Sequence, residues 1–469
     1  MKGMLGEIYD RDGKPLFCDT AVFVTRRLLP VLAKSAVAGF VVGGVVTLFN
    51  YLLEIAGEFA ALFAGIARSG VWLSLCYIVL MACVAVFMYF FTRVLPEGRG
   101  SGIPRTEASA CGKMRLKWWR LCLATVVGST VSFFAGIPVG AEGPSVQLGG
   151  GLGAGVEEAD GTVTRGRRPV MTAGIAAGVA GAFIAPATGF LFTLEEVQRK
   201  FDPLMCACAA VSVFYAYAVR ILLGGALGMK TVFIAAEGLS ALPVAYMWAP
   251  VIAGIAAALV ARIFNEIILR TDSLGAKSRV PMWIPLVVVF LLSGVVNIFI
   301  ADEVGSGMTI INGIIGGGYD WAETFLLFAV KLILVCIVFR AAPTGGMMVP
   351  MLAIGAMAGQ LAGLLCAEAG MPDDYVAVIA LVTMCAFFGS SIKAPFTVVM
   401  LFLETTAMWD NAAAVMVAVL VATALGTVLG QKPLYDTLWM RDVRRRELDG
   451  IPYFRTTKGS RKAADGAAE

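Results

Sequence analysis

Three glycine-rich turns that run into a proline are the segments best suited to chemistry in this chain. They lie at residues 100–104, 140–144 and 345–350. Glycine lets the backbone turn sharply and approach other atoms closely, and proline in the first turn of a helix gives up no hydrogen bond. Each turn therefore predicts a helix start. Helix starts present unpaired N–H groups and the positive end of the helix dipole, so several starts aimed at one point would bind an anion.

A carboxylate, Glu142, lies within the second of these turns. The chain contains no histidine, the side chain that most often handles protons near neutral pH, so proton chemistry here is expected to use carboxylates. An ionised Glu142 carboxylate could occupy the position where the anion binds, and its protonation would make that position available to the anion. The alternative is an ordinary first-turn glutamate that complements the helix dipole. We predict that Glu142 is the gate and the external proton site.

The composition shows what kind of fold positions these turns. Apolar residues make up 59% of the 469 residues, charged residues make up 15%, and the mean hydropathy is +0.82. We therefore expect an all-α, polytopic membrane protein. Residues 1–19 have mixed charge, which predicts no cleaved leader. Apolar stretches of about 20 residues, enough to span a bilayer, recur along the chain, for example at residues 36–53, 71–91, 242–260, 284–300 and 412–429.

The chain also contains an internal repeat. Segments 185–195 and 394–404 both begin with Ala-Pro-x-Thr and end with Leu-Glu, and turn 140–144 matches turn 346–350 in the same order. After the first turn the chain runs toward a basic cluster, and after the second toward an acidic loop that lacks lysine and arginine, so the halves are predicted to be inverted. Inverted repeats of tilted, broken helices bring helix ends together near the bilayer midplane, where transporters bind their substrates.

Basic residues indicate the topology. They gather at residues 26–27, 93–120, 165–168 and 199–200 and after residue 431, and the positive-inside rule places such clusters in the cytoplasm. We expect a multi-pass protein of the cell membrane with both termini cytoplasmic. The predicted parts are a cytoplasmic N-terminal segment (1–29), a first membrane repeat (30–228), a connecting loop (229–242), a second membrane repeat (243–430), and a cytoplasmic C-terminal helix and tail (431–469).

The motifs Gly-Ser-Gly-Ile-Pro, Gly-x-Glu-Gly-Pro, Gly-x-x-x-Pro and a late Pro-Leu-Tyr, in this order and spacing, resemble the CLC family of chloride channels and chloride/proton antiporters. The resemblance covers nearly the whole chain. It implies a homodimer with a separate pathway in each subunit, in which side-chain hydroxyls and backbone amides hold chloride. The residues that it assigns to anion binding are Ser101, Gly143, Met347, Met348 and Tyr435.

Glu196 matches the glutamate through which this family passes protons to the cytoplasm. The neighbouring Arg199 and Lys200 fit a position near that face, but they also fit a simple salt bridge at a helix end. Glu195 repeats as Glu404, so we expect it to be a structural partner and not the proton carrier. The presence of Glu196 favours exchange of chloride for protons. The alternative is a passive, voltage- or pH-gated chloride channel of the same fold.

Two positions depart from the family pattern. The family usually carries arginine or lysine where this chain has Ala141, and phenylalanine where it has Met348. We expect these changes to affect conductance and the width of the inner pore, because a positive charge is lost and methionine is more flexible than phenylalanine. Chloride is the expected substrate, and other halides and nitrate are expected to permeate as well.

Other classes of function fit the sequence poorly. A serine protease of the Ser-His type is excluded without histidine, and we find no plausible metal-ligand cluster, so neither an enzyme nor a metal or cofactor site is expected. The net charge of +4 is too small to indicate nucleic-acid binding. After Tyr435 we expect a short basic tail and not the paired cytosolic regulatory domains of some CLC members.

Overall fold

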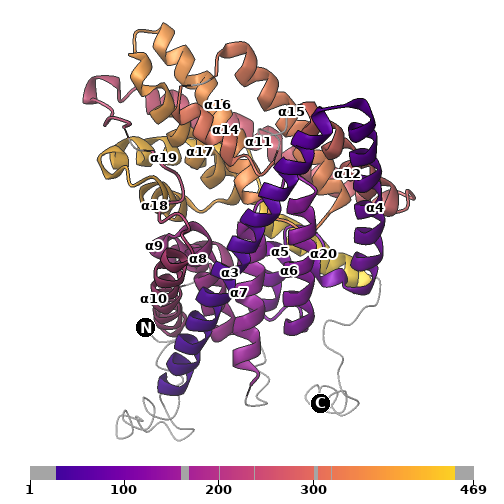
Figure 1. Cartoon of the computed structure of the whole chain (residues 1–469). Helices are drawn as coiled ribbons and strands as arrows, with labels where there is room; N and C mark the ends of the chain where they lie inside the picture. The colour runs from indigo at the N-terminus through magenta and orange to yellow at the C-terminus, as the bar shows by residue number, and fades with distance from the viewer. Residues whose placement is uncertain are drawn as a thin grey trace, which may run out of the picture.

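The described chain consists of helices joined by short turns and loops (Figure 1). In this computed structural model, the only extended pairings among the described residues are two isolated β-bridges, Gly100 with Thr344 and Gly140 with Gly346. The predicted all-α architecture is confirmed. The structure describes residues 28–159, 168–199, 201–236, 238–299, 305–317 and 319–448.

Several predictions of topology concern residues outside this part of the chain. These are the cytoplasmic ends within 1–27 and 449–469, including Arg26 and Arg27, and the basic residues Arg165, Arg167 and Lys200.

The first half of the protein runs from α3 to α10. Proline occupies the first turn of α3, α5, α8, α9 and α10, where its missing N–H removes no helical hydrogen bond. A π-helical turn, η4 (Thr193–Gln198), follows α9 directly. The helices are α3 (Leu29–Arg68), α4 (Val71–Val94), α5 (Ile103–Ala110), α6 (Trp118–Phe134), α7 (Glu142–Glu157), α8 (Pro169–Phe183), α9 (Pro186–Phe192) and α10 (Pro203–Ala226), with the short η3 (Pro96–Gly98) before α5.

The second half runs from α11 to α19 and is followed by α20. Its helices are α11 (Ala249–Lys277), α12 (Trp283–Phe299), α14 (Met308–Ile315), α15 (Trp321–Ala341), α16 (Met348–Glu368), α17 (Val376–Ile392), α18 (Pro395–Thr406), α19 (Ala412–Val428) and α20 (Leu434–Leu448). This half also contains three short 3₁₀ turns: η5 (Val244–Tyr246) before α11, η6 (Asp373–Tyr375) before α17 and η7 (Trp409–Asn411) before α19.

Eight helical segments of the described chain are long and apolar enough to cross a bilayer, as the hydropathy predicted. They differ in how far they are covered. In the apolar windows of α16 and α17, 83% and 94% of the residues are buried inside the protein, against 22% in α4. The pair α16–α17 therefore belongs to the core, while α4 presents its side chains outward. The predicted apolar stretch 242–260 overlaps the membrane-crossing segment Val244–Lys277, in which the short η5 precedes α11.

The two halves pack in the same way, in agreement with the predicted repeat. Helix α7 packs on α8 as α16 packs on α17, and α3 packs on α10 as α11 packs on α19 (Figure 1). The repeated glycines serve these contacts. A Cβ on Gly149 of α7 would lie 2.2 Å from the Gly174 carbonyl oxygen of α8, and a Cβ on Gly359 of α16 would lie 2.7 Å from the Ala380 Cα of α17. Small residues allow this close approach of helices in a membrane.

A pair of glutamates joins the halves reciprocally. The Glu404 carboxylate accepts hydrogen bonds from the N–H groups of Ala187 and Thr188 at the start of α9, at 2.8 and 2.7 Å. In the same way, the Glu195 carboxylate accepts from Phe396 and Thr397 at the start of α18, at 3.1 and 2.7 Å. Each half therefore caps a helix of the other, because a carboxylate satisfies orphan N–H groups and complements the helix dipole. These bonds give Glu195 the structural role expected of it.

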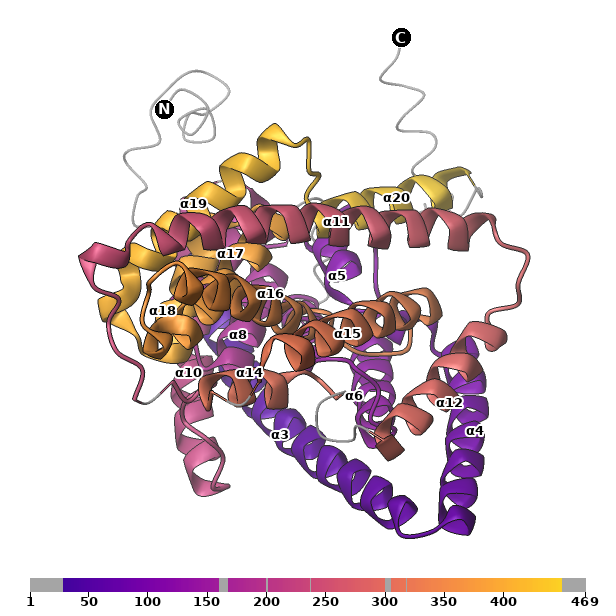
Figure 2. The same ribbon diagram turned by 90° about the horizontal axis from the view of Figure 1, so that it is seen from above.

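Helix α20 lies alongside α11, as Figure 2 shows. The Arg441 guanidinium of α20 donates to the Leu269 carbonyl oxygen of α11 at 2.7 Å, and Arg445 pairs with Asp272 of the same helix. These contacts fix the direction of α20 and hence the position of Tyr435, its second residue.

Candidate functional site

The glycine-rich turns of the two halves meet. Gly140 and Gly346 exchange two backbone hydrogen bonds, each 2.8 Å from nitrogen to oxygen. The turn before α5 joins them, since the Gly345 N–H donates to the Gly100 carbonyl oxygen at 3.3 Å. The starts of α5, α7 and α16 are thus held in one place, each with first-turn N–H groups that have no partner within their own helix.

Glycine is required where these turns touch. A Cβ on Gly143 would lie 2.6 Å from the Ser101 carbonyl oxygen and 2.7 Å from the Gly346 Cα. A Cβ on Gly346 would lie 2.7 Å from the Gly143 nitrogen. Gly143 therefore lies directly between Ser101 of one turn and Gly346 of another. Met347 is the N-cap of α16 and Met348 its first residue, and both side chains are buried.

A cavity of about 360 Å³, which we call the Ser101 cavity, reaches these turns. Ser101 and Met347 line it, and the Ser101 hydroxyl makes no hydrogen bond with another described residue. Two carboxylates of its wall, Asp272 and Asp442, are outnumbered by four guanidinium groups, which leave the wall with a net positive charge that attracts anions. The guanidinium groups belong to Arg99, Arg105, Arg340 and Arg445.

A second cavity of about 940 Å³, the Glu142 cavity, is lined by Glu142 together with the basic side chains of Arg220 and Lys230. Val139, just before the α7 turn, lines both cavities, so the two approach each other at this turn. The Glu142 side chain folds back over its own turn, because a Cβ on Gly140 would lie 2.3 Å from Glu142 Oε2. That oxygen is buried and has no hydrogen-bond partner among the described residues. The carboxyl group thus lies near the junction of the two cavities.

Tyr435 is fully buried, and its hydroxyl has no hydrogen-bond partner in the described part of the chain. Its helix, α20, packs against α5, which begins just after Ser101. A buried hydroxyl without a partner is unfavourable. Tyr435 therefore has a donor to offer to a bound anion.

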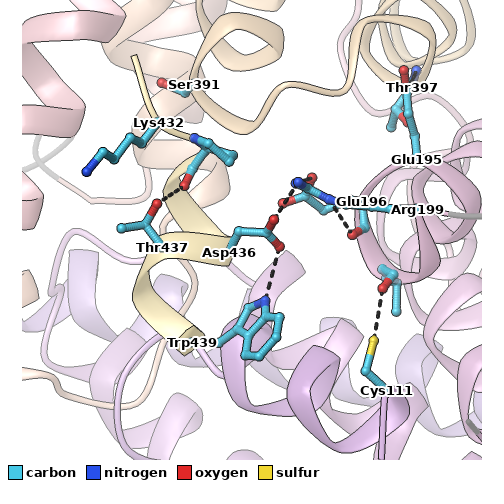
Figure 3. Close-up of polar contacts among 12 residues, drawn as sticks. Cys111, Glu195, Glu196, Arg199, Ser391, Thr397, Lys432, Asp436, Thr437 and Trp439 are labelled. Atoms are coloured by element: carbon cyan, nitrogen blue, oxygen red, sulfur yellow. Dashed lines mark hydrogen bonds and ion pairs between the residues drawn. The ribbon is translucent and has the colours of Figure 1, made fainter. Parts of the chain in front are cut away.

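Glu196 lies in the π-helical turn η4, and its side chain is 0% exposed. The Arg199 guanidinium donates to Glu196 Oε2 at 3.0 Å and also pairs with Asp436 of α20 (Figure 3). The salt bridge considered as an alternative for Glu196 is therefore present. It satisfies only one oxygen, because Glu196 Oε1 has no hydrogen-bond partner among the described residues. Glu196 remains free to take part in proton transfer at that oxygen.

A fourth glycine turn was missed in the sequence. Gly305-Ser306-Gly307 repeats Gly100-Ser101-Gly102 in the second half and starts α14 as the other starts α5. Gly102 and Gly307 both have positive φ angles, 77° and 107°, which favour glycine. The repeated Gly-Ser-Gly was the available signal, but methionine and threonine follow it in place of isoleucine and proline. Ser306 lines the Glu142 cavity.

Two carboxylates near Glu196 were also missed. Glu107 of α5 and Asp436 of α20 each have a carboxylate oxygen within 4.8 Å of one another and of one from Glu196. The three residues are far apart in the sequence and lie in three elements, so no spacing pattern predicts that their carboxylates meet.

Known proteins with similar sequences and structures share one family. The family model described as voltage gated chloride channel matches residues 81–427. The H(+)/Cl(-) exchange transporter ClcA of Yersinia pseudotuberculosis serotype IB (strain PB1/+) is 28% identical over 463 residues, which cover 95% of this chain and 91% of that protein. The protein of the same name from Salmonella newport (strain SL254) is 28% identical over 382 residues, covering 79% and 80%.

Two solved structures resemble the fold. A slow cyanobacterial Cl⁻/H⁺ antiporter superimposes with a TM-score of 0.81 at 22% identity, covering 89% of this chain and 99% of the other. A CLC-type fluoride/proton antiporter superimposes with a TM-score of 0.70 at 19% identity, covering 86% and 97%.

Proposed function

This chain belongs to the voltage gated chloride channel family, and from that premise we propose that it is a secondary active transporter that exchanges chloride for protons. The observation that carries the proposal is the meeting of three helix starts between two cavities, with a buried carboxyl group, Glu142, at the junction. The exchange transporters named among its relatives support the same activity.

In this proposal, chloride is bound by oriented hydrogen-bond donors, namely backbone amides and side-chain hydroxyls, that carry no full charge. Moving a bare ion into a low-dielectric interior costs on the order of tens of kcal/mol by the Born estimate. The amides at Gly143, Met347 and Met348, with the hydroxyls of Ser101 and Tyr435, offset this cost. Because none of these groups carries a full charge, the ion can also leave. Other halides and nitrate fit such a site as well.

Glu142 couples the anion to the proton. Ionised, its carboxylate competes with chloride for the helix-start amides, since both are anions. Protonated, it leaves that place to chloride and carries the proton toward the Glu142 cavity. A bound chloride nearby favours the protonated form, because like charges repel. The two ions are therefore exchanged in opposite directions.

Glu196 supplies the proton from the other side. It is buried, it holds one oxygen without a hydrogen-bond partner among the described residues, and its partner Arg199 is 37% exposed at the side chain. Protons thus have a route from water past Arg199 to Glu196 and on toward Glu142. A chloride channel needs no such second carboxyl group.

The proposal also includes the membrane location, the orientation and the oligomeric state of the protein. We place the protein in the cell membrane with both termini in the cytoplasm, as the positive-inside rule favours. We also propose a homodimer with one pathway in each subunit, an arrangement that the resemblance to the CLC family supports. Crosslinking of purified protein in liposomes would test the dimer.

The test of function is proton uptake driven by a chloride gradient in liposomes that hold purified protein. The natural chain should move protons against their gradient, and Glu142→Gln should stop this while chloride still flows. If chloride flows through the natural chain without ever moving protons, the protein is a passive channel and the proposal is wrong.

A further inference from the structure

Glu196 does not stand alone at the proton site. Carboxylate oxygens of Glu107, Glu196 and Asp436 lie within 4.8 Å of one another, and each residue is buried. Three elements bring them together: α5, the π-helical turn η4 and α20 (Figure 3 shows the last two). We call these three residues the carboxylate cluster.

One cation serves two members of this cluster. Arg199 donates to Glu196 Oε2 at 3.0 Å and pairs through a second nitrogen with Asp436 Oδ2. Its backbone φ of 49°, which is unusual for a residue with a side chain, turns the chain at the end of η4. The single guanidinium is thus shared between a carboxylate of η4 and one of α20.

The third member has no partner. Glu107 is 1% exposed, and neither of its carboxylate oxygens has a hydrogen-bond partner among the described residues. Three carboxylates around one guanidinium leave surplus negative charge in a buried place, which is unfavourable unless a proton is shared among them. When two such groups interact strongly, the proton belongs to the group of sites and not to one residue.

We propose that the inner proton site is the whole carboxylate cluster, in which Asp436 and Glu107 act as positioning residues that keep a proton available to Glu196. The proposal rests on the exchange function proposed above and deepens it. Asp436 draws part of the Arg199 charge away from Glu196. Without Asp436, Arg199 would pair with Glu196 alone and hold it in the ionised form, so fewer protons would be passed on.

The same residue connects the proton site to the anion site. Asp436 directly follows Tyr435, whose buried hydroxyl faces no partner in the described chain, and it also accepts a hydrogen bond from Trp439 Nε1 at 3.0 Å. The pair Arg199–Asp436 therefore fastens the start of α20, and with it Tyr435, to the turn that carries Glu196. Proton occupancy of the cluster and the position of Tyr435 become linked.

The experiment measures proton and chloride fluxes separately in liposomes for the natural chain and four variants. Asp436→Asn keeps an oxygen for Trp439 but removes the charge, and we expect protons moved per chloride to fall about threefold or more while chloride still flows. Asp436→Glu restores the charge and should recover most of the ratio. Asp202→Asn is the matched control: it removes a carboxylate near Arg199 in the sequence, but asparagine can still cap α10. Its ratio should equal that of the natural chain.

Glu107→Gln provides an independent arm and should also lower the ratio while chloride still flows. If both Asp436→Asn and Glu107→Gln keep the natural ratio, or if chloride and proton fluxes fall together, the cluster has only a structural role and the inference is wrong. If the natural chain itself moves no protons, the proposed exchange function fails instead, so the two failures are distinguishable.

Discussion

The two halves of the protein agree at some equivalent positions and differ at others, and the difference separates architecture from chemistry. Glu195 and Glu404 are equivalent, and each caps a helix of the opposite half. Glu142, in contrast, has Met348 as its equivalent, and the equivalent of Glu196 is Thr405. The repeated glutamates, Glu195 and Glu404, hold the two halves together. Of these glutamates, the two that do not repeat, Glu142 and Glu196, are the ones to which we assign proton transfer.

Because Glu142 and Glu196 have no titratable equivalents in the second half, the two sides of a nearly symmetric fold carry different titratable groups. Two identical halves would present the same groups to both sides of the membrane. Here one half supplies Glu142 and Glu196, while Met348 and Thr405 at the matching places carry no titratable group. Thr405 instead donates its hydroxyl to the Leu401 carbonyl oxygen within α18. The two proposed proton carriers, Glu142 and Glu196, therefore both come from the first half, whereas the helix starts proposed to bind the anion come from both halves.

The largest effect is expected where the halves touch. Gly346→Ala would place a Cβ 2.7 Å from the Gly143 nitrogen and 2.9 Å from the Gly140 carbonyl oxygen, between backbone atoms that cannot yield. Overpacking of this kind costs about 1–3 kcal/mol or more. We expect a lower midpoint of thermal unfolding in detergent and loss of chloride transport in liposomes. Gly44→Ala is the control, since its Cβ would meet only Val219 Cγ1 at 4.0 Å, and it should not lower the midpoint.

A smaller effect is expected at the reciprocal caps. Glu195→Ala and Glu404→Ala each remove hydrogen bonds between a carboxylate and two backbone N–H groups. Such charge-assisted bonds contribute about 2 kcal/mol, so each variant should lower the unfolding midpoint, and by similar amounts. The number of protons moved per chloride should not change in either variant. A changed ratio in Glu195→Ala alone would break the distinction between repeated and unrepeated glutamates.

The smallest effect concerns the two serines of the Gly-Ser-Gly turns. Ser306 already accepts a hydrogen bond from the Met308 N–H at 3.5 Å, whereas the Ser101 hydroxyl makes none with another described residue. Ser101→Ala should weaken chloride binding about tenfold, the value of one hydrogen bond to a charged group, and Ser306→Ala should change it less than about twofold. Calorimetric titration with chloride measures both. Equal losses would mean that the serines act alike.

Local patterns predicted much of this arrangement. The Gly-Pro turns predicted helix starts, because a sharp turn favours glycine, the first turn of a helix favours proline, and the two residues lie close together in the sequence. The matching positions of Glu195 and Glu404 in the two repeats predicted that Glu195 has a structural role. The cluster of Glu107, Glu196 and Asp436 could not be predicted, because its members meet only after α5, η4 and α20 have packed. The shared Arg199 is equally a product of tertiary structure.

The apolar pattern located one spanning segment without the start of its helix, and one glycine turn was missed. The apolar stretch 242–260 did not show that Pro243 and the short η5 precede α11. Gly305-Ser306-Gly307 went unnoticed because the turn is not completed by proline. Apolar composition reports burial or lipid contact and not backbone geometry, so it cannot locate a helix end without a proline or glycine signal.

The most direct test of the account exchanges one unrepeated carboxylate for its equivalent in the other half. Glu196→Thr places the residue found at position 405 into the first half. The measurement is proton uptake driven by a chloride gradient in liposomes, with chloride flux recorded in the same preparation. We predict that chloride still flows and that protons are no longer moved uphill. Proton uptake at the level of the natural chain would contradict the account.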